Sequence, residues 1–232
     1  TYMKFLAIYI YNSLILIYLL WGDYFMEKYQ LTFPQLSLWS VEQFYKGTSI
    51  NVITGFIKIN ETVNFHLFND AIEILIKNTD IFGMHLSYEN GELTQVLTTP
   101  KNKGIRLINV SCKEELENLQ NTIAKTPFNI FEDDLFDFTI FKLPDNTGGV
   151  IGRFHHIICD AWATSLIITR IMTIYQNLLN NLSPTEGINF ESYVNYIVSE
   201  ELYVNSPKFK KSKEFWLNTF NSNFSYSYLS SN

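Results

Sequence analysis

The feature that most constrains the fold is a short junction between two apolar segments of different periodicity. Residues 154–162 read Phe-His-His-Ile-Ile-Cys-Asp-Ala-Trp, and two of the 4 histidines in the chain are adjacent there. The apolar run at 149–154 predicts a strand, and the run at 161–180 predicts a long helix. Two imidazoles at a strand-to-helix junction, followed by a carboxylate, are typical of a site that handles protons.

The rest of the chain also alternates between strand and helix patterns. Strands are expected at residues 51–59, 105–110, 135–143 and 149–154, with a hairpin at 84–97 around an Asn-Gly turn. Helices are expected from about 32 to 47 and over 65–76, 112–125, 161–180, 190–203 and 207–220. This alternation predicts an α/β or α+β layered sandwich.

Composition favours a packed domain and disfavours nucleic acid as a partner. The chain is 47% hydrophobic and only 17% charged, so most of it does not resemble a disordered segment. The formal net charge is -6, whereas phosphate binding needs clustered cations. The single basic cluster is expected to be a solvated helix face; it comprises Lys208, Lys210, Lys211 and Lys213.

The two cysteines, Cys112 and Cys159, form neither a metal pattern nor a disulfide framework. A reducing, cytoplasmic setting is therefore predicted. Cys159 lies close to His156 in sequence, but its apolar neighbours favour a small core residue over a nucleophile.

Residues 1–25 form a hydrophobic segment whose status the sequence leaves open. The chain begins with Thr1, and residues 5–21 read FLAIYIYNSLILIYLLW, at the lower limit of length for a membrane span. The alternatives are a membrane anchor, an amphipathic or buried helix, and translated upstream sequence with the natural start at Met26. A secretory signal peptide is disfavoured because no small-residue cleavage site follows. A membrane is expected as a partner only if residues 5–21 are a real anchor.

Asp160 lies where the N-cap of the following helix belongs, since a carboxylate there accepts bonds from free backbone N–H groups. It could alternatively orient an imidazole or pair with Arg153. If the preceding strand reaches His156, alternation places Arg153 and His155 on one face and His156 on the other. The two histidines are then expected to do different jobs, one packing and one facing a cleft.

Two other chemistries are disfavoured at this junction. A metal bound by His155, His156 and Asp160 is not expected, because adjacent histidines rarely converge on one ion and no further strong ligand is near. A Ser–His–Asp hydrolase is not expected, because no G-x-S-x-G motif occurs around Ser165. The plain alternative is a strand, a turn and a helix with two partly buried histidines.

The stretch from His155 to Ala161 resembles the H-H-x-x-x-D-G signature of the condensation domains of nonribosomal peptide synthetases. Two further stretches carry the same resemblance. Residues 31–39, LTFPQLSLW, are similar to the opening motif of that family, and residues 194–220 are similar to its segment after the catalytic helix. The resemblance runs from about residue 29 to residue 220.

The resemblance implies a lobe similar to chloramphenicol acetyltransferase, with a mixed sheet flanked by helices. It also implies amide formation, in which an acceptor amine attacks a donor thioester delivered on the phosphopantetheine of a carrier protein. No cofactor is implied to bind directly, and the implied partners are carrier proteins and neighbouring synthetase modules. His156 is implied as the catalytic residue, with His155 and Asp160 as structural support and Ala161 and Trp162 as motif neighbours.

The chain departs from the family pattern in three ways. Ala161 replaces the motif glycine, and Asn78 stands where an arginine commonly pairs with the motif aspartate, so Arg153 is expected to compensate or Asp160 to act only as a helix cap. The chain also has about half the family's length. Residues 26–182 are expected to form the N-terminal lobe and 183–232 a helical crossover toward a second lobe. A stand-alone acyltransferase that uses a soluble acyl donor and a non-catalytic carrier-docking module are the alternatives.

Overall fold

The computed structural model describes residues 28–100 and 105–221, so the hydrophobic run at 5–21 lies outside the described residues. Within the described ranges, no helix combines the length and apolar character needed to cross a membrane. The chain divides after Glu191 into two compact units. The first contains every strand of the described part of the chain, and the second contains two helices.

The main sheet of the first unit has four strands in the order β2-β7-β6-β5. Strands β2 (Val52–Ile59), β7 (Gly148–His155) and β6 (Phe136–Lys142) pair antiparallel. Strand β5 (Arg106–Asn109) runs parallel to β6, and the crossover between them is helix α4 (Lys113–Lys125). A parallel pair needs such a crossover because a tight turn can only reverse the chain.

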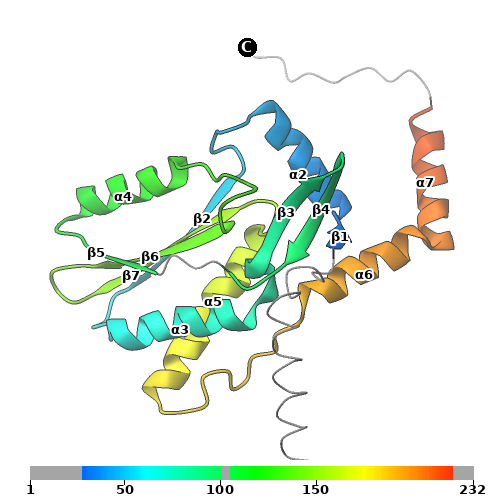
Figure 1. Cartoon of the computed structure of the whole chain (residues 1–232). Coiled ribbons are helices and arrows are strands. Elements are labelled where there is room, and N and C mark those ends of the chain that lie inside the picture. The colour runs from blue at the N-terminus through cyan, green and yellow to red at the C-terminus, as the bar shows by residue number, and fades with distance from the viewer. Residues whose placement is uncertain (1–27, 101–104, 222–232) are drawn as a thin grey trace, which may run out of the picture. The chain divides into compact units, whose positions relative to one another are not determined.

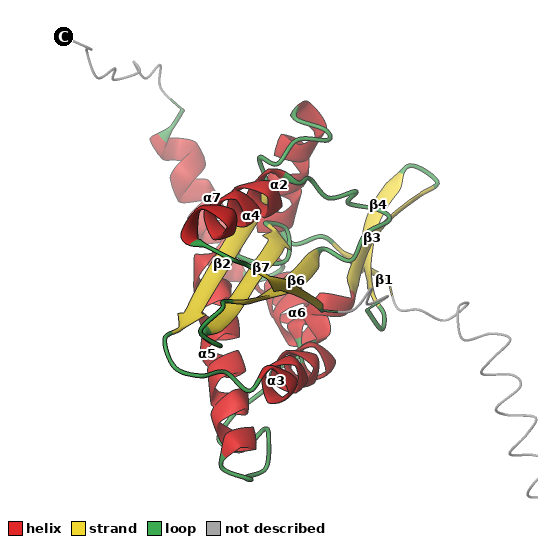
Figure 2. Cartoon of the chain, turned by 90° about the vertical axis from the view of Figure 1, so that its left-hand side faces the viewer, coloured by secondary structure: helices red, strands yellow, loops and turns green. Residues whose placement is uncertain are grey.

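Helices cover both faces of this sheet. Helix α4 lies on one face, while α3 (Phe65–Asn78) and α5 (Ala161–Leu179) lie on the other (Figures 1 and 2). Alternation along the strands sends side chains to both layers. Phe138 and Phe154 join the core beneath α3 and α5, whereas Phe141 and Ile151 pack with α4. The predicted layered α+β sandwich with a mixed sheet is therefore confirmed.

A smaller sheet has the order β1-β4-β3. Strands β3 (Met84–Glu89) and β4 (Glu92–Leu97) form the predicted hairpin, and both turn residues, Asn90 and Gly91, have positive φ as a tight primed turn requires. Strand β1 (Lys28–Gln30) pairs with β4, and the 3-10 turn η2 (Asp80–Gly83) precedes β3. Sequence patterns missed β1, because three residues are too few to show alternation.

Helix α2 (Phe33–Phe44) begins where the Thr-Phe-Pro sequence predicted, with Thr32 as its N-cap. The second unit consists of α6 (Tyr193–Val204) and α7 (Pro207–Thr219), each with a serine N-cap whose side chain accepts a backbone N–H. All four lysines of the basic cluster lie on α7 and are exposed, as expected of a solvated helix face.

Gly149 in β7 tests the packing of the main sheet. A Cβ atom there would collide with the carbonyl oxygen of Ile57 in β2 and would lie 2.8 Å from the Phe141 ring. Backbone cannot retreat as a side-chain tip can, so Gly149→Ala should lower the free energy of unfolding by about 1–3 kcal/mol. Urea denaturation measures the loss. Ser165→Ala, at a helical position outside the core, is the control and should change stability by less than about 0.5 kcal/mol. An unchanged midpoint for Gly149→Ala would contradict this packing.

Candidate active site

The histidine junction is the turn that joins β7 to α5. Strand β7 ends at His155, whereas the alternation argument assumed that the strand reaches His156. His156 is instead the first residue of the turn. Two backbone hydrogen bonds fix the junction to neighbouring segments: the His155 N–H donates to Leu135 O at 2.8 Å, and the His156 N–H donates to Asn51 O at 2.7 Å. The peptide path through both histidines is therefore held on both sides.

His155 is buried, and both of its ring nitrogens are occupied. Its Nδ1 accepts the Ile157 N–H at 3.1 Å, so the neutral ring carries its proton on Nε2, which lies 3.4 Å from Glu42 Oε2. The same carboxylate oxygen accepts the Asn51 side-chain amide at 2.7 Å. Burial lowers the pKa of His155 and outweighs the opposing effect of Glu42. His155 is thus a neutral structural imidazole near pH 7.

His156 is half-buried and differs from His155 in the state of its ring. Its Nδ1 is buried and has no hydrogen-bond partner in the part of the chain that the structure describes. Its backbone is fixed, while its imidazole forms no hydrogen bond with a described residue. The two adjacent histidines therefore differ: both ring nitrogens of His155 contact other residues of the protein, and the ring of His156 is not hydrogen-bonded to a described residue.

Asp160 is the N-cap of α5. Its Oδ1 accepts the Ala163 N–H at 2.7 Å, and its carbonyl oxygen accepts both the backbone N–H and the hydroxyl of Thr164. Because the first N–H groups of a helix lack intrahelical partners, this carboxylate stabilises the start of α5 directly. Ala161 and Trp162 follow it at the exposed start of the helix, and Trp162 is 74% exposed.

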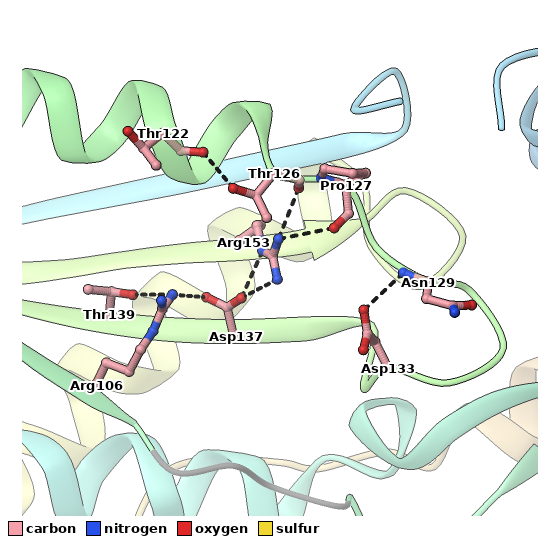
Figure 3. A network of polar contacts seen from close by, with 9 residues as sticks. All are labelled: Arg106, Thr122, Thr126, Pro127, Asn129, Asp133, Asp137, Thr139 and Arg153. Carbon is pink, nitrogen blue, oxygen red and sulfur yellow. Dashed lines mark hydrogen bonds and ion pairs between the residues drawn. The ribbon is translucent and has the colours of Figure 1, made fainter. Parts of the chain in front are cut away.

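Arg153 does not pair with Asp160. It lies on the α4 face of the sheet, where its Nε donates to Asp137 Oδ2 at 2.7 Å and its Nη1 donates to Thr126 O at 2.9 Å (Figure 3). Its guanidinium also lies 4.0 Å from the centre of the Phe128 ring. The expectation that Arg153 compensates for Asn78 is therefore wrong, because β7 directs the arginine to the face opposite α5. Asn78 itself donates to Ile74 O within α3.

Cys159 is a core residue. Burial raises the pKa of its thiol to about 11, so the thiolate needed for nucleophilic attack is scarce near neutral pH. Its sulfur lies 3.2 Å from the Thr164 hydroxyl, next to the Asp160 cap. This agrees with the sequence interpretation of Cys159 as a small buried side chain.

Buried polar residues of α2 and β4 support the junction. Sequence reasoning noted Gln35 only as part of the motif at 31–39, and it missed Glu42 and Gln95. Gln35 in α2 and Gln95 in β4 exchange amide hydrogen bonds at 2.9 and 3.0 Å, and Gln35 Nε2 also lies 3.4 Å from Ile157 O. Glu42 lies two helical turns after Gln35, on the same face of α2. Two buried polar residues at this spacing on one helix face were the available signal.

Comparisons with known proteins identify the family of the chain. The model of the family described as "Condensation domain" matches residues 26–231, so the chain belongs to the condensation domain family. Surfactin synthase subunit 1 of Bacillus subtilis (strain 168) is 30% identical in an alignment 209 residues long, which covers 84% of this chain and 6% of that protein. The dimodular nonribosomal peptide synthase of the same strain is 24% identical over 83% of this chain and 8% of its own length.

Solved structures show the same fold. The starter condensation domain of rhizomide synthetase RzmA matches with a TM-score of 0.77 and 20% identity over 83% of this chain and 48% of that chain. The first condensation domain of the calcium-dependent antibiotic synthetase matches with a TM-score of 0.75 and 16% identity over 84% and 48%. The chain therefore has the chloramphenicol acetyltransferase-like fold of these domains. It spans about half of those structures and less than a tenth of the curated relatives named above.

Two variants of Asp160 separate its capping role from its charge. Asp160→Ala removes the acceptor for the Ala163 N–H and should lower the free energy of unfolding by about 0.5–2 kcal/mol. Asp160→Asn keeps an acceptor at the same place and should lose only a few tenths of a kcal/mol. Urea titrations of the two variants measure the difference. Equal losses would show that the negative charge, not the cap, is what α5 requires.

The burial of His155 predicts a pH dependence of stability. The folded-state pKa lies below the ordinary value near 6.5, so between the two values the unfolded chain binds a proton that the folded chain does not. Stability should therefore fall as pH drops below about 6.5, by at most roughly 1.4 kcal/mol per pH unit from this residue. Urea denaturation of the wild type and His155→Gln from pH 7.5 to 5 isolates the contribution, and the variant should show a flatter profile. An imidazole NMR titration midpoint for His155 at or above 6.5 would contradict it.

Proposed function

We propose that residues 26–182 form the N-terminal lobe of a condensation domain in a nonribosomal peptide synthetase, and that 183–232 form its helical crossover. In this proposal an acceptor amine attacks a donor thioester to form an amide. The observation that carries the proposal is the unequal state of the two motif histidines. Both ring nitrogens of His155 interact with other residues of the protein, whereas the ring of His156 forms no hydrogen bond with the described residues.

The chemistry needs one proton acceptor near an amine. A free α-amine has a pKa of roughly 7.7–8.0 and is largely protonated near neutral pH, and a thioester is already an activated acyl donor. As the amine nitrogen bonds to the thioester carbon, His156 accepts an amine proton or orients the amine, and the departing sulfur is then protonated to a thiol. The C–N bond forms and the C–S bond breaks, so no oxidant or metal is consumed.

The rigid surroundings of His156 support this role. Its backbone is tied to Asn51, and the neighbouring ring of His155 is held by Glu42, so the backbone that carries the imidazole is fixed. The start of α5 follows within the same junction. The Ala163 and Thr164 N–H groups are already bound to Asp160, so the N–H groups of Ala161 and Trp162 are the ones that can stabilise the oxyanion of the tetrahedral intermediate. The Asp160 cap fixes the orientation of that helix start.

The proposed substrates arrive covalently attached. Phosphopantetheine arms of carrier proteins would present the donor and the acceptor, and the domain itself would bind no separate cofactor. Carrier proteins and neighbouring synthetase modules are the proposed partners, and the proposed location is the cytoplasm. The curated relatives named above are peptide or surfactin synthases, which supports this assignment.

Removal of the His156 imidazole tests the catalytic role. In the complete gene product that contains this chain, His156→Ala should lower amide formation from a carrier-bound acyl thioester and an amine acceptor by about 10²–10⁴-fold. Mass spectrometry of the product under single-turnover conditions gives the rate. His66→Ala, on the exposed side of α3, should retain full activity. Full retention by His156→Ala, with the fold intact, would instead favour the non-catalytic docking module.

A further inference from the structure

A cavity of about 750 Å³ borders the buried Glu42–His155 pair, yet neither histidine lines it. It lies among α2, the tip of the β3–β4 hairpin and the segment 127–131, all within the first unit. Its volume is in the range of small-molecule sites. His156 does not line the cavity, and the amide-forming chemistry proposed above does not use it.

Four aromatic rings line this cavity: Trp39, Tyr88, Phe128 and Phe131. Trp39 and Phe131 make an edge-to-face contact with ring centres 5.5 Å apart. Aromatic faces carry partial negative charge and attract ammonium groups, most strongly where water is excluded. The lining is therefore suited to an apolar ligand that bears a positive charge.

The wall formed by segment 127–131 is already fixed. Arg153 donates to Pro127 O at 3.4 Å, and Asp133 accepts the Asn129 N–H at 2.9 Å (Figure 3). The Arg153 guanidinium also lies over the Phe128 ring. Asp137 holds Arg153 in turn. A ligand that enters does not have to order this wall, and this lowers the entropic cost of binding.

A buried carboxylate supplies the negative charge in this cavity. Glu42 is only 6% exposed, and both of its hydrogen bonds, from Asn51 and His155, go to Oε2. Oε1 accepts no hydrogen bond from the residues that the structure describes, and Glu42 is among those that line the cavity. The other charged lining residue, Lys46, is exposed and forms no ion pair with Glu42 within 4.0 Å. Among the residues that line the cavity, the buried charged one is thus the Glu42 carboxylate.

We propose that this cavity binds a small organic cation, with an ammonium group against Glu42 Oε1 and an apolar body among the aromatic rings. A charge-assisted hydrogen bond to a buried carboxylate is stronger than a neutral one, and the rings add cation–π attraction. This proposal does not rest on the proposed function, since the binding of a probe requires no acyl transfer. Either proposal can fail while the other stands.

Binding of three matched probes to the whole chain tests this. 3-Phenylpropylammonium carries the cation, 3-phenylpropan-1-ol is neutral, and 3-phenylpropionate carries an anion that would be attracted to Lys46 instead of Glu42. Titration followed by 1H–15N NMR should show the cation binding at least about tenfold more tightly than either other probe, with shifts at the Trp39 indole and the Gly47 amide. Equal affinities, a preference for the anion, or shifts elsewhere would overturn the proposal.

Variants then identify the carboxylate. Glu42→Gln keeps an acceptor for Asn51 and should abolish the preference for the cation, while the control Glu114→Gln, at an exposed position on α4, should retain it. Phe131→Leu provides an independent check if Glu42→Gln fails to fold. Phe131 is 40% exposed, so its replacement should leave the fold intact, and its ring is one of those proposed to contact the cation. Phe131→Leu should weaken the binding of the cationic probe about threefold or more, and it should weaken the binding of the alcohol less. Unchanged preference in a folded Glu42→Gln or in Phe131→Leu would contradict the site.

Discussion

The buried hydrogen bond between Glu42 and His155 is the constraint on which the rest of the first unit depends. It joins α2 to the end of β7, and the Asn51 side chain joins the same carboxylate to the start of β2. An unpaired buried charge or imidazole would be costly, so the three groups are stable only together. Asn51 also holds the His156 backbone through its carbonyl oxygen, and Glu42 also lines the aromatic cavity.

The fold was largely predictable because local patterns and tertiary packing agree. The alternation in β6 and β7, the Asn90-Gly91 turn and the helical stripe of α3 each specify one structure from neighbouring residues alone. Strand β1 was not predictable, since three residues carry no period. The pairing order of the strands could not be predicted from the sequence either, because it depends on contacts between segments far apart in the chain.

The candidate site was predictable in its motif but not in its support. The adjacent histidines and the Asp160 cap follow from residue type and position. The partner of Arg153 did not, because it depends on which face of β7 meets α4 and on Asp137 in the adjacent strand. Glu42 and Gln95 were missed, and Gln35 was noted only as part of the motif at 31–39, for a related reason: a buried polar side chain is recognised only when its partner is known.

The sequence separation of these contacts has a consequence for the order of folding. Glu42 and His155 are 113 residues apart, and Gln35 and Ile157 are 122 apart. During synthesis, α2 and β2 emerge long before β7 exists, so their buried polar groups must remain hydrated until the second half of the unit is made. Such non-local pairing slows folding, whereas the β3–β4 hairpin and α3 need only nearby partners. The histidine junction is thus expected to form after the hairpin and α3, and Glu42 lacks its His155 partner until then.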